Sequence, residues 1–164
     1  MIEYCDRTVV KSDYHQFTIG PSSLRELNFS EYPEFNLGVF TGETVVVYAG
    51  CRVGPVNVEL EVHDTQPPDN AMDWEDVAEG DMHYDSPEGA ALWHWSLDQA
   101  LPQDSDRKLT PGGAHRYRVR ICARGRALEY DGPVLGEPVE DYLVQLWPTS
   151  SPSPAHQSKN ESGV

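Results

Sequence analysis

The segment Val56-Asn57-Val58-Glu59-Leu60-Glu61-Val62 alternates apolar and polar residues without a break. This period of two is typical of a β-strand with one face in the core and the other face toward solvent. We therefore predict a strand over residues 56–62 whose core-facing side chains are Val56, Val58, Leu60 and Val62.

Residues 116–123 show the same alternation. Their four apolar side chains are predicted to face the core: Tyr117, Val119, Ile121 and Ala123. The opposite face carries three arginines, Arg116, Arg118 and Arg120. Opposite charges on neighbouring strands are a common cross-strand pair, so we expect these arginines to pair within the protein, for example with the polar face of residues 57–61. Binding of a phosphate or a carboxylate-rich partner is the alternative.

Other β-like segments are separated by Gly and Pro. They lie at residues 8–19, 39–40, 44–49, 82–84, 90–97 and 142–147. Short helices are expected at most at residues 22–28 and 74–79. The pattern predicts an all-β protein, a single antiparallel β-sandwich with Greek-key or jelly-roll-like connections.

The length of 164 residues fits one domain with a core of its own. Residues 1–148 are predicted to form the β-sandwich domain. Residues 149–164 are rich in Ser and Pro and contain little apolar surface to offset the entropy of ordering, so we expect a disordered tail.

Composition narrows the classes of partner. A formal net charge of −15 favours cationic partners and disfavours nucleic acid and anionic membranes. Fourteen acids and no Lys or Arg occupy residues 59–106, whereas seven Lys or Arg and no acid occupy residues 107–126. No apolar run is long enough to span a bilayer, and the N-terminus lacks the features of a secretory signal, so we expect a cytoplasmic protein.

The most unusual segment is 69–81, which carries six acids around Met72 and Trp74. It follows two prolines and is expected to be a loop or a short helix. Carboxylates that steer encounter and an aromatic residue that anchors the contact suit a cationic protein partner. The predicted partner-binding residues are Asp69, Asp73, Trp74, Glu75, Asp76, Glu79 and Asp81; the alternative is that Trp74 covers the core beneath a solvated loop.

The sequence contains few residues that point to metal binding, thiol chemistry or catalysis. The spacing Asp81-x-His83-x-Asp85 places three possible metal ligands on one strand face, but a solvated acidic face is the favoured interpretation. Cys5, Cys51 and Cys122 are widely spaced and are expected to be free thiols. Cys51 and Cys122 lie in or beside predicted strands and are expected to be buried. No catalytic motif or cofactor-binding motif is present, so we predict a protein that is not an enzyme and has no cofactor, with a small-ligand or metal-binding module and an uncatalogued enzyme as alternatives.

One family resemblance adds a functional expectation. The segment Tyr14-His15-Gln16-Phe17-Thr18-Ile19 resembles the opening strand of the bacterial competence protein J family, and Met72-Asp73-Trp74 resembles a motif of that family. Those proteins are short, all-β inhibitors of a DNA-entry nuclease. The resemblance implies an inhibitor or immunity-type role against a basic nuclease or toxin. The segments 122–126 and 142–148 also resemble small uncharacterised bacterial β-proteins, which imply no function.

Overall fold

The computed structural model describes residues 1–21, 37–40, 42–87, 89–104, 106–107, 109–110 and 113–164. The predicted helix at residues 22–28 lies outside these ranges. The described residues form eleven strands and one 3-10 helix: β1 (Ile2–Asp13), β2 (Gln16–Gly20), β3 (Gly38–Phe40), β4 (Val45–Tyr48), β5 (Val53–His63), η1 (Ala71–Asp73), β6 (Asp76–Ser86), β7 (Ala91–Trp93), β8 (Gln99–Leu101), β9 (Gly113–Arg124), β10 (Asp141–Pro148) and β11 (His156–Asn160). Within these ranges, no helix is long and apolar enough to cross a membrane.

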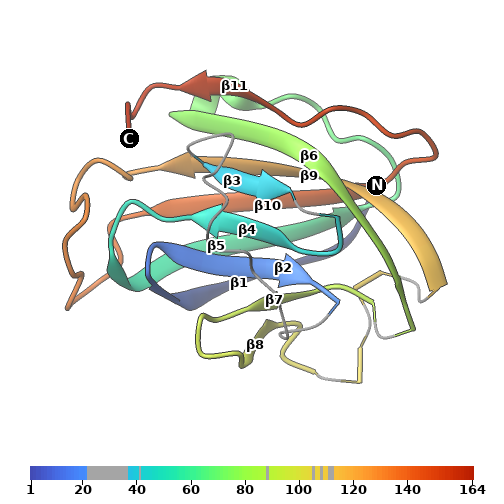
Figure 1. The fold of residues 1–164 in the computed structure, drawn as a ribbon, viewed down its shortest axis with the longest axis horizontal. Helices are drawn as coiled ribbons and strands as arrows, with labels where there is room; N and C mark the ends of the chain where they lie inside the picture. Colours follow the sequence, from blue (N-terminus) through green and yellow to red (C-terminus); the bar gives the residue numbers. More distant parts are fainter. Residues whose placement is uncertain (22–36, 41, 88, 105, 108, 111–112) are drawn as a thin grey trace.

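The strands belong to one sheet in the order β11-β6-β9-β10-β5-β1-β2-β4-β3, and β7 and β8 continue from β2 (Figure 1). The all-β prediction is confirmed. A purely antiparallel arrangement is wrong, because β10 and β5 run parallel. The cause is a crossover: after β5 the chain passes β10 and β9 and adds β6 beyond them, so β5 and β6 point the same way.

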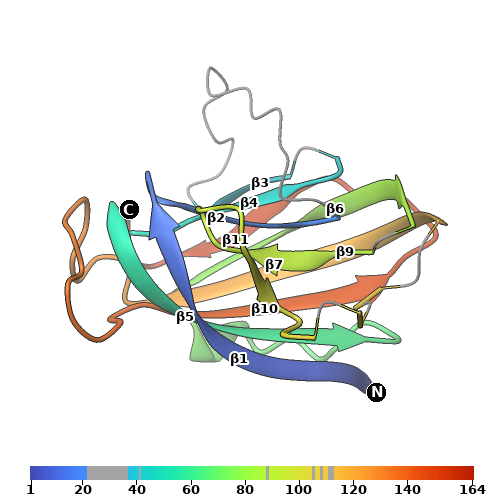
Figure 2. The ribbon, with the colours of Figure 1, turned by 90° about the horizontal axis from the view of Figure 1, so that it is seen from below.

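The sheet curls into a half-barrel, so that strands far apart in its order come together (Figure 2). The amide of His83 in β6 donates to the carbonyl of Gly42, just beyond β3, at 2.6 Å. A side chain at Gly80 would collide with the Phe40 ring, so glycine is needed where β3 crosses β6. A division into the two layers of a sandwich stays a prediction.

The core lies inside the curl, and the predicted strand registers hold. In β5 the side chains of Val56, Val58, Leu60 and Val62 are at most 1% exposed, and in β9 the four predicted apolar residues are also buried. Each such aliphatic side chain contributes about 1.5–3 kcal/mol through removal from water. Alternation therefore identified the inner face of both long strands.

The predicted strand at residues 8–19 is in fact a hairpin. β1 and β2 pair antiparallel around Tyr14 and His15, whose φ angles are 50° and 63°. Two positive φ angles are typical of a type I′ turn, which usually contains Asn and Gly. Residues 11–16 contain no Gly, Pro or Asn to mark this turn, which is why the sequence indicated one strand.

Residues 149–164 also differ from the disordered tail that their composition predicts. β11 adds antiparallel to β6 at the edge of the sheet. Arg118 donates to the carbonyls of Ser153 and Pro154, each at 3.0 Å, and the backbone amide of Ser162 donates to Asp76. Hydrogen bonds to charged side chains, and not burial of apolar surface, hold this segment in place. The amino-acid composition of the segment does not reveal such bonds.

Candidate functional site

The acidic segment predicted to bind a partner is divided between two structures. Residues 69–75, here called the η1 loop, contain η1 and lie on the outer face of the sheet, whereas residues 76–81 belong to β6. The predicted helix at residues 74–79 is therefore wrong. In β6, Val77 is buried against the outer-face residues Cys122 and Leu143, and a strand satisfies this packing.

Three of the four acids in β6 are bound by arginines of the same protein, namely Asp76, Glu79 and Asp81. Asp76 is fully buried and lies 2.9 Å from Nη1 of Arg126. Glu79 forms ion pairs with Arg118 and Arg120, each at 3.2 Å. Glu79 holds the outer face together, whereas Asp76 lies on the same inner face as Ala78, and neither carboxylate has much surface left for a partner.

Asp81 completes this set of ion pairs. It lies 3.0 Å from Arg118 and 3.3 Å from Arg116, and it also accepts a hydrogen bond from the amide of Ser153. The carboxylate that a metal site at Asp81, His83 and Asp85 would need is thus already occupied.

The prediction that the β9 arginines pair internally is confirmed, with different partners from those expected. Strand β6, not β5, supplies the carboxylates, and Arg120 reaches β5 only through Gln145, which donates to Glu61 at 2.9 Å. Arg118 and Arg120 are 6% and 2% exposed, so their face is not a solvent face. The η1 loop and the 149–164 segment cover it, and the Pro68 carbonyl accepts from Arg120.

Exposed acids remain in the η1 loop. Asp69 and Asp73 are exposed, and Met72 between them is 95% exposed. Trp74 is half-buried against the apolar cluster of Val77, Cys122 and Leu143. The η1 loop thus exposes Met72 and the carboxylates of Asp69 and Asp73, while Trp74 packs against the sheet beneath them.

Two contacts fix the end of this loop. The guanidinium of Arg124 lies over the Trp74 ring, 4.8 Å from its centroid. The Glu75 carboxylate accepts a hydrogen bond from the amide of Gly125 at 2.6 Å. These contacts tie the loop to the last residue of β9 and to the residue that follows it, so that Trp74 and Glu75 act as supports as well as surface residues.

A groove of about 550 Å³ runs beside Trp74 on the outer face. Its lining comes from β1, β5, β10, Trp74 and Arg124: Arg7, Thr8, Val9, Asn57, Val58, Glu59, Trp74, Arg124, Asp141 and Tyr142. A smaller hollow of about 350 Å³ continues past Arg124 and Asp141 to Leu128 and Val139. Sequence reasoning missed this groove because no pattern in the chain shows that β1 lies beside β5.

Two exposed ion pairs line the groove. Arg7 lies 3.3 Å from Glu59, and Arg124 lies 3.0 Å from Asp141. Such pairs are typically worth 1 kcal/mol or less, so a ligand can exchange for either partner at low cost.

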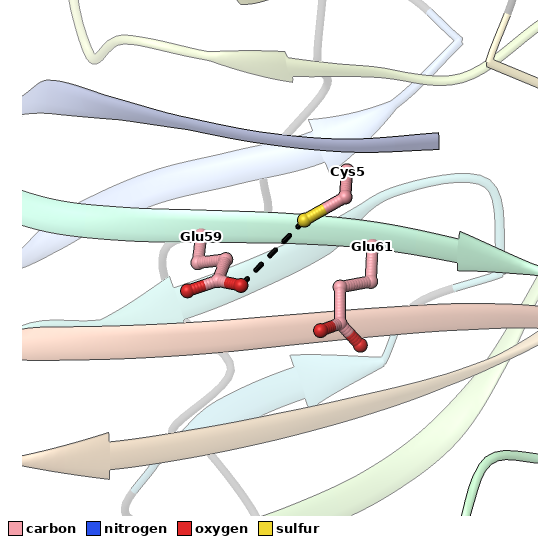
Figure 3. Close-up of side chains that lie close together, drawn as sticks. All are labelled: Cys5, Glu59 and Glu61. Carbon is pink, nitrogen blue, oxygen red and sulfur yellow. Dashed lines mark hydrogen bonds between the residues drawn. The ribbon is translucent and has the colours of Figure 1, made fainter. Parts of the chain in front are cut away.

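Cys5, Glu59 and Glu61 lie close together on β1 and β5, with ligand atoms within 4.8 Å of one another (Figure 3). The Cys5 thiol contacts a Glu59 oxygen at 3.6 Å, and partial burial followed by the charge of Glu59 raises the pKa of this thiol. Glu61 accepts from Gln145 and contacts His63, and Glu59 pairs with Arg7. Both carboxylates of the cluster therefore already have partners in the protein, and we assign no metal to it.

The other two cysteines are buried free thiols, as predicted. Burial raises the pKa of Cys51 and of Cys122 to about 12. The charge of Glu140 contributes to the shift at Cys51. Neither thiol is poised as a nucleophile.

Two solved structures are similar to this protein in fold. ComJ from Bacillus subtilis, an inhibitor of the DNA degrading activity of NucA, superposes with a TM-score of 0.55 at 11% identity, over 91% of this chain and 99% of that one. The crocagin biosynthetic gene J product superposes with a TM-score of 0.54 at 13% identity, over 90% and 99%. No family model and no curated protein matches the sequence. The resemblance indicated by residues 14–19 is confirmed at the level of the fold.

Proposed function

We propose that this protein is an inhibitor-type binding module whose partner is a basic protein of the nuclease kind. Three findings support the proposal. The fold resembles that of ComJ over nearly the whole of both chains. The net charge is −15. The η1 loop presents Met72 to solvent between two exposed carboxylates, and this presentation is the observation that carries the proposal.

The proposed contact surface is a revision of the acidic segment. Asp69 and Asp73 steer a cationic partner toward the loop, since exposed charges accelerate encounter and lose this effect in salt. Met72 is the residue that a partner can bury, because a flexible thioether adapts to irregular surfaces. Trp74 and Glu75 hold the loop against β9, and Glu79 and Asp81 stabilise the face beneath it, while Asp76 fixes the start of β6 through Arg126.

The experiment compares inhibition and binding for matched variants. NucA and a set of basic DNA-degrading nucleases are assayed with the wild-type protein, and any nuclease that is inhibited is taken to surface binding kinetics. The double variant Asp69→Asn with Asp73→Asn should slow association and flatten its salt dependence. Met72→Ala should speed dissociation, by about tenfold or more for an anchor worth roughly 2 kcal/mol.

The control removes the same charge elsewhere. Glu43→Gln with Asp85→Asn changes two exposed acids away from the loop and should leave both rates unchanged. Equal loss in the two double variants would show that only net charge matters. Absence of inhibition of every basic nuclease tested would make the proposal wrong.

A second candidate is supported by the groove beside Trp74. Its two exposed arginines, Arg7 and Arg124, and the amide of Asn57 suit a small ligand with an anionic group. Titration with a panel of small carboxylates and phosphates, followed through Trp fluorescence, tests it. Arg7→Gln and Arg124→Gln should each weaken any binding that is real.

A further inference from the structure

A second surface forms where three turns from distant parts of the sequence meet. They are the β1–β2 turn, the β7–β8 turn and the loop after β9, all in the left-hand part of Figure 1. The rings of Tyr14 and Trp95 lie 5.3 Å apart, and those of His15 and Tyr130 lie 6.1 Å apart. We call Tyr14, His15, Trp95, Leu97, Tyr130 and Asp131 the three-turn surface.

Large apolar side chains on this surface are open to solvent. Tyr14 is 66% exposed, Tyr130 is 58% exposed and Leu97 is 47% exposed, while Trp95 is half-buried beneath Tyr14. Neighbouring exposed aromatic and aliphatic residues are typical of protein contact sites, where tyrosine and tryptophan supply much of the affinity.

The backbone of the surface is strained. Among the described residues, the four non-glycine residues with positive φ are Tyr14, His15, Leu97 and Asp131, and all four belong to it. This conformation costs a bulky residue roughly 1–2 kcal/mol, whereas Asn or Gly would adopt it cheaply. The presence of Tyr, His and Leu at these positions, where Asn or Gly would cost less, points to a use for their side chains.

Hydrogen bonds hold the strained turns in place. His15 Nε2 contacts the Asp131 carboxylate at 2.9 Å, and the amide of Trp95 donates to the Lys11 carbonyl at 3.0 Å. The amide of Asp131 donates to the Gly50 carbonyl at 2.9 Å. A surface fixed in this way loses little conformational entropy when it binds.

The charges around the surface identify the chemistry of the partner. Three acids adjoin it in the sequence, Asp13, Asp98 and Glu129, and Asp131 belongs to it. Two bases adjoin it through backbone hydrogen bonds, Lys11 beside Trp95 and Arg52 beside His15. An acidic rim on a protein with a net charge of −15 repels a second copy and attracts a basic surface.

From these observations we propose that the three-turn surface binds a segment of a basic protein in which lysines or arginines flank an apolar side chain. The exposed rings of Tyr14 and Tyr130 contact the apolar residue, and the acidic rim contacts the flanking cations. This site lies on different residues from the η1 loop, and the inference does not rest on the partner being a nuclease.

The test is an NMR titration of ¹⁵N-labelled protein with two peptides. The probe peptide carries lysines and arginines around a central Trp-Leu pair, and the comparison peptide has Ser at both central positions. We expect saturable shifts of the amides of Tyr14, His15, Leu97 and Tyr130 with the probe, and binding weaker by about tenfold or more with the comparison peptide.

Two variants and a control complete the test. Tyr14→Asn suits a positive φ and keeps the turn, and Tyr130→Ser removes the second ring; each should weaken probe binding by about tenfold or more. Leu135→Ser changes a leucine that is 92% exposed in the same loop but outside the surface, and should have no effect. The inference is overturned if the shifts fall on the η1 loop, if the two peptides bind equally, or if nothing shifts at millimolar peptide. A nuclease assay that fails while this titration succeeds would count against the proposed function alone.

Discussion

The Asp76 carboxylate and the Arg126 guanidinium form an ion pair at 2.9 Å in which both side chains are at most 3% exposed. Asp76 also accepts hydrogen bonds from the amide and hydroxyl of Ser162, and Arg126 donates to the Tyr48 carbonyl. The pair therefore joins the start of β6 to the loop after β9, to the end of β4 and to the C-terminal segment.

Asp76→Asn should destabilise the protein by about 3–5 kcal/mol, because it removes the carboxylate charge that faces the buried guanidinium of Arg126. Urea unfolding measures the loss. Asp73→Asn, at an exposed acid three residues earlier, serves as the control and should change stability by less than about 0.5 kcal/mol. Adding Arg126→Met to Asp76→Asn should recover part of the loss, and a double variant no more stable than Asp76→Asn would contradict this account of the pair.

Deletion of residues 149–164 should lower stability by roughly 2 kcal/mol or more, since Arg118 loses two carbonyl acceptors and Asp76 loses Ser162. Thermal unfolding gives the size of the effect. Amide hydrogen exchange locates the effect in the chain, because the amides of β6 that pair with β11 should exchange faster after the deletion. An unchanged melting temperature would mean that the segment does not dock and that the composition argument for a disordered tail was right.

Among the three cysteines, Cys5 should react with a disulfide reagent in the native protein, while Cys51 and Cys122 should react only on unfolding. Burial and the Glu59 carboxylate raise the pKa of Cys5, so its thiolate fraction at pH 8 is low and its reaction should be slower than that of an unfolded thiol. Glu59→Gln removes the charge and should speed labelling, and Cys5→Ser should abolish it. Faster labelling of Cys122 than of Cys5 would contradict the burial described above.

His94 is expected to make a pH-dependent contribution to the free energy of unfolding. Burial, followed by the charge of Lys11, lowers the pKa of His94 below its usual value near 6.5, and its Nδ1 accepts a hydrogen bond from the Lys11 amide. The unfolded chain then binds a proton more readily than the folded chain. The contribution is present above about pH 6.5 and is lost as the pH falls from there toward the lower folded pKa.

The measurement compares the wild type with His94→Asn, which keeps an acceptor near the Lys11 amide but does not titrate. Melting temperatures taken between about pH 8 and pH 5 should fall more for the wild type on acidification. Parallel curves for the two proteins would show that His94 does not contribute to the pH dependence.

The sequence by itself determined the class of the fold and the inner face of its long strands. Alternation over residues 56–62 and 116–123 assigned Val58, Leu60, Val119 and Ile121 to the core, because the period of two is a local property of an extended chain. The same pattern indicated that the β9 arginines pair within the protein. The frequent burial of free cysteine, and not the alternation, indicated that Cys51 and Cys122 are buried.

Tertiary structure alone decided which residues meet. Glu79 and Asp81 reach Arg118 and Arg120 because the chain crosses two strands between β5 and β6, and no local pattern specifies that crossover. The crossover buried half of the acidic segment that the sequence presented as one surface, and left Asp69, Met72 and Asp73 exposed. No local pattern in the sequence predicts the turn at Tyr14 or the strand at residues 156–160. Contacts with distant residues offset the backbone strain of the turn and the ordering entropy of the strand, whereas sequence patterns report only the neighbours along the chain.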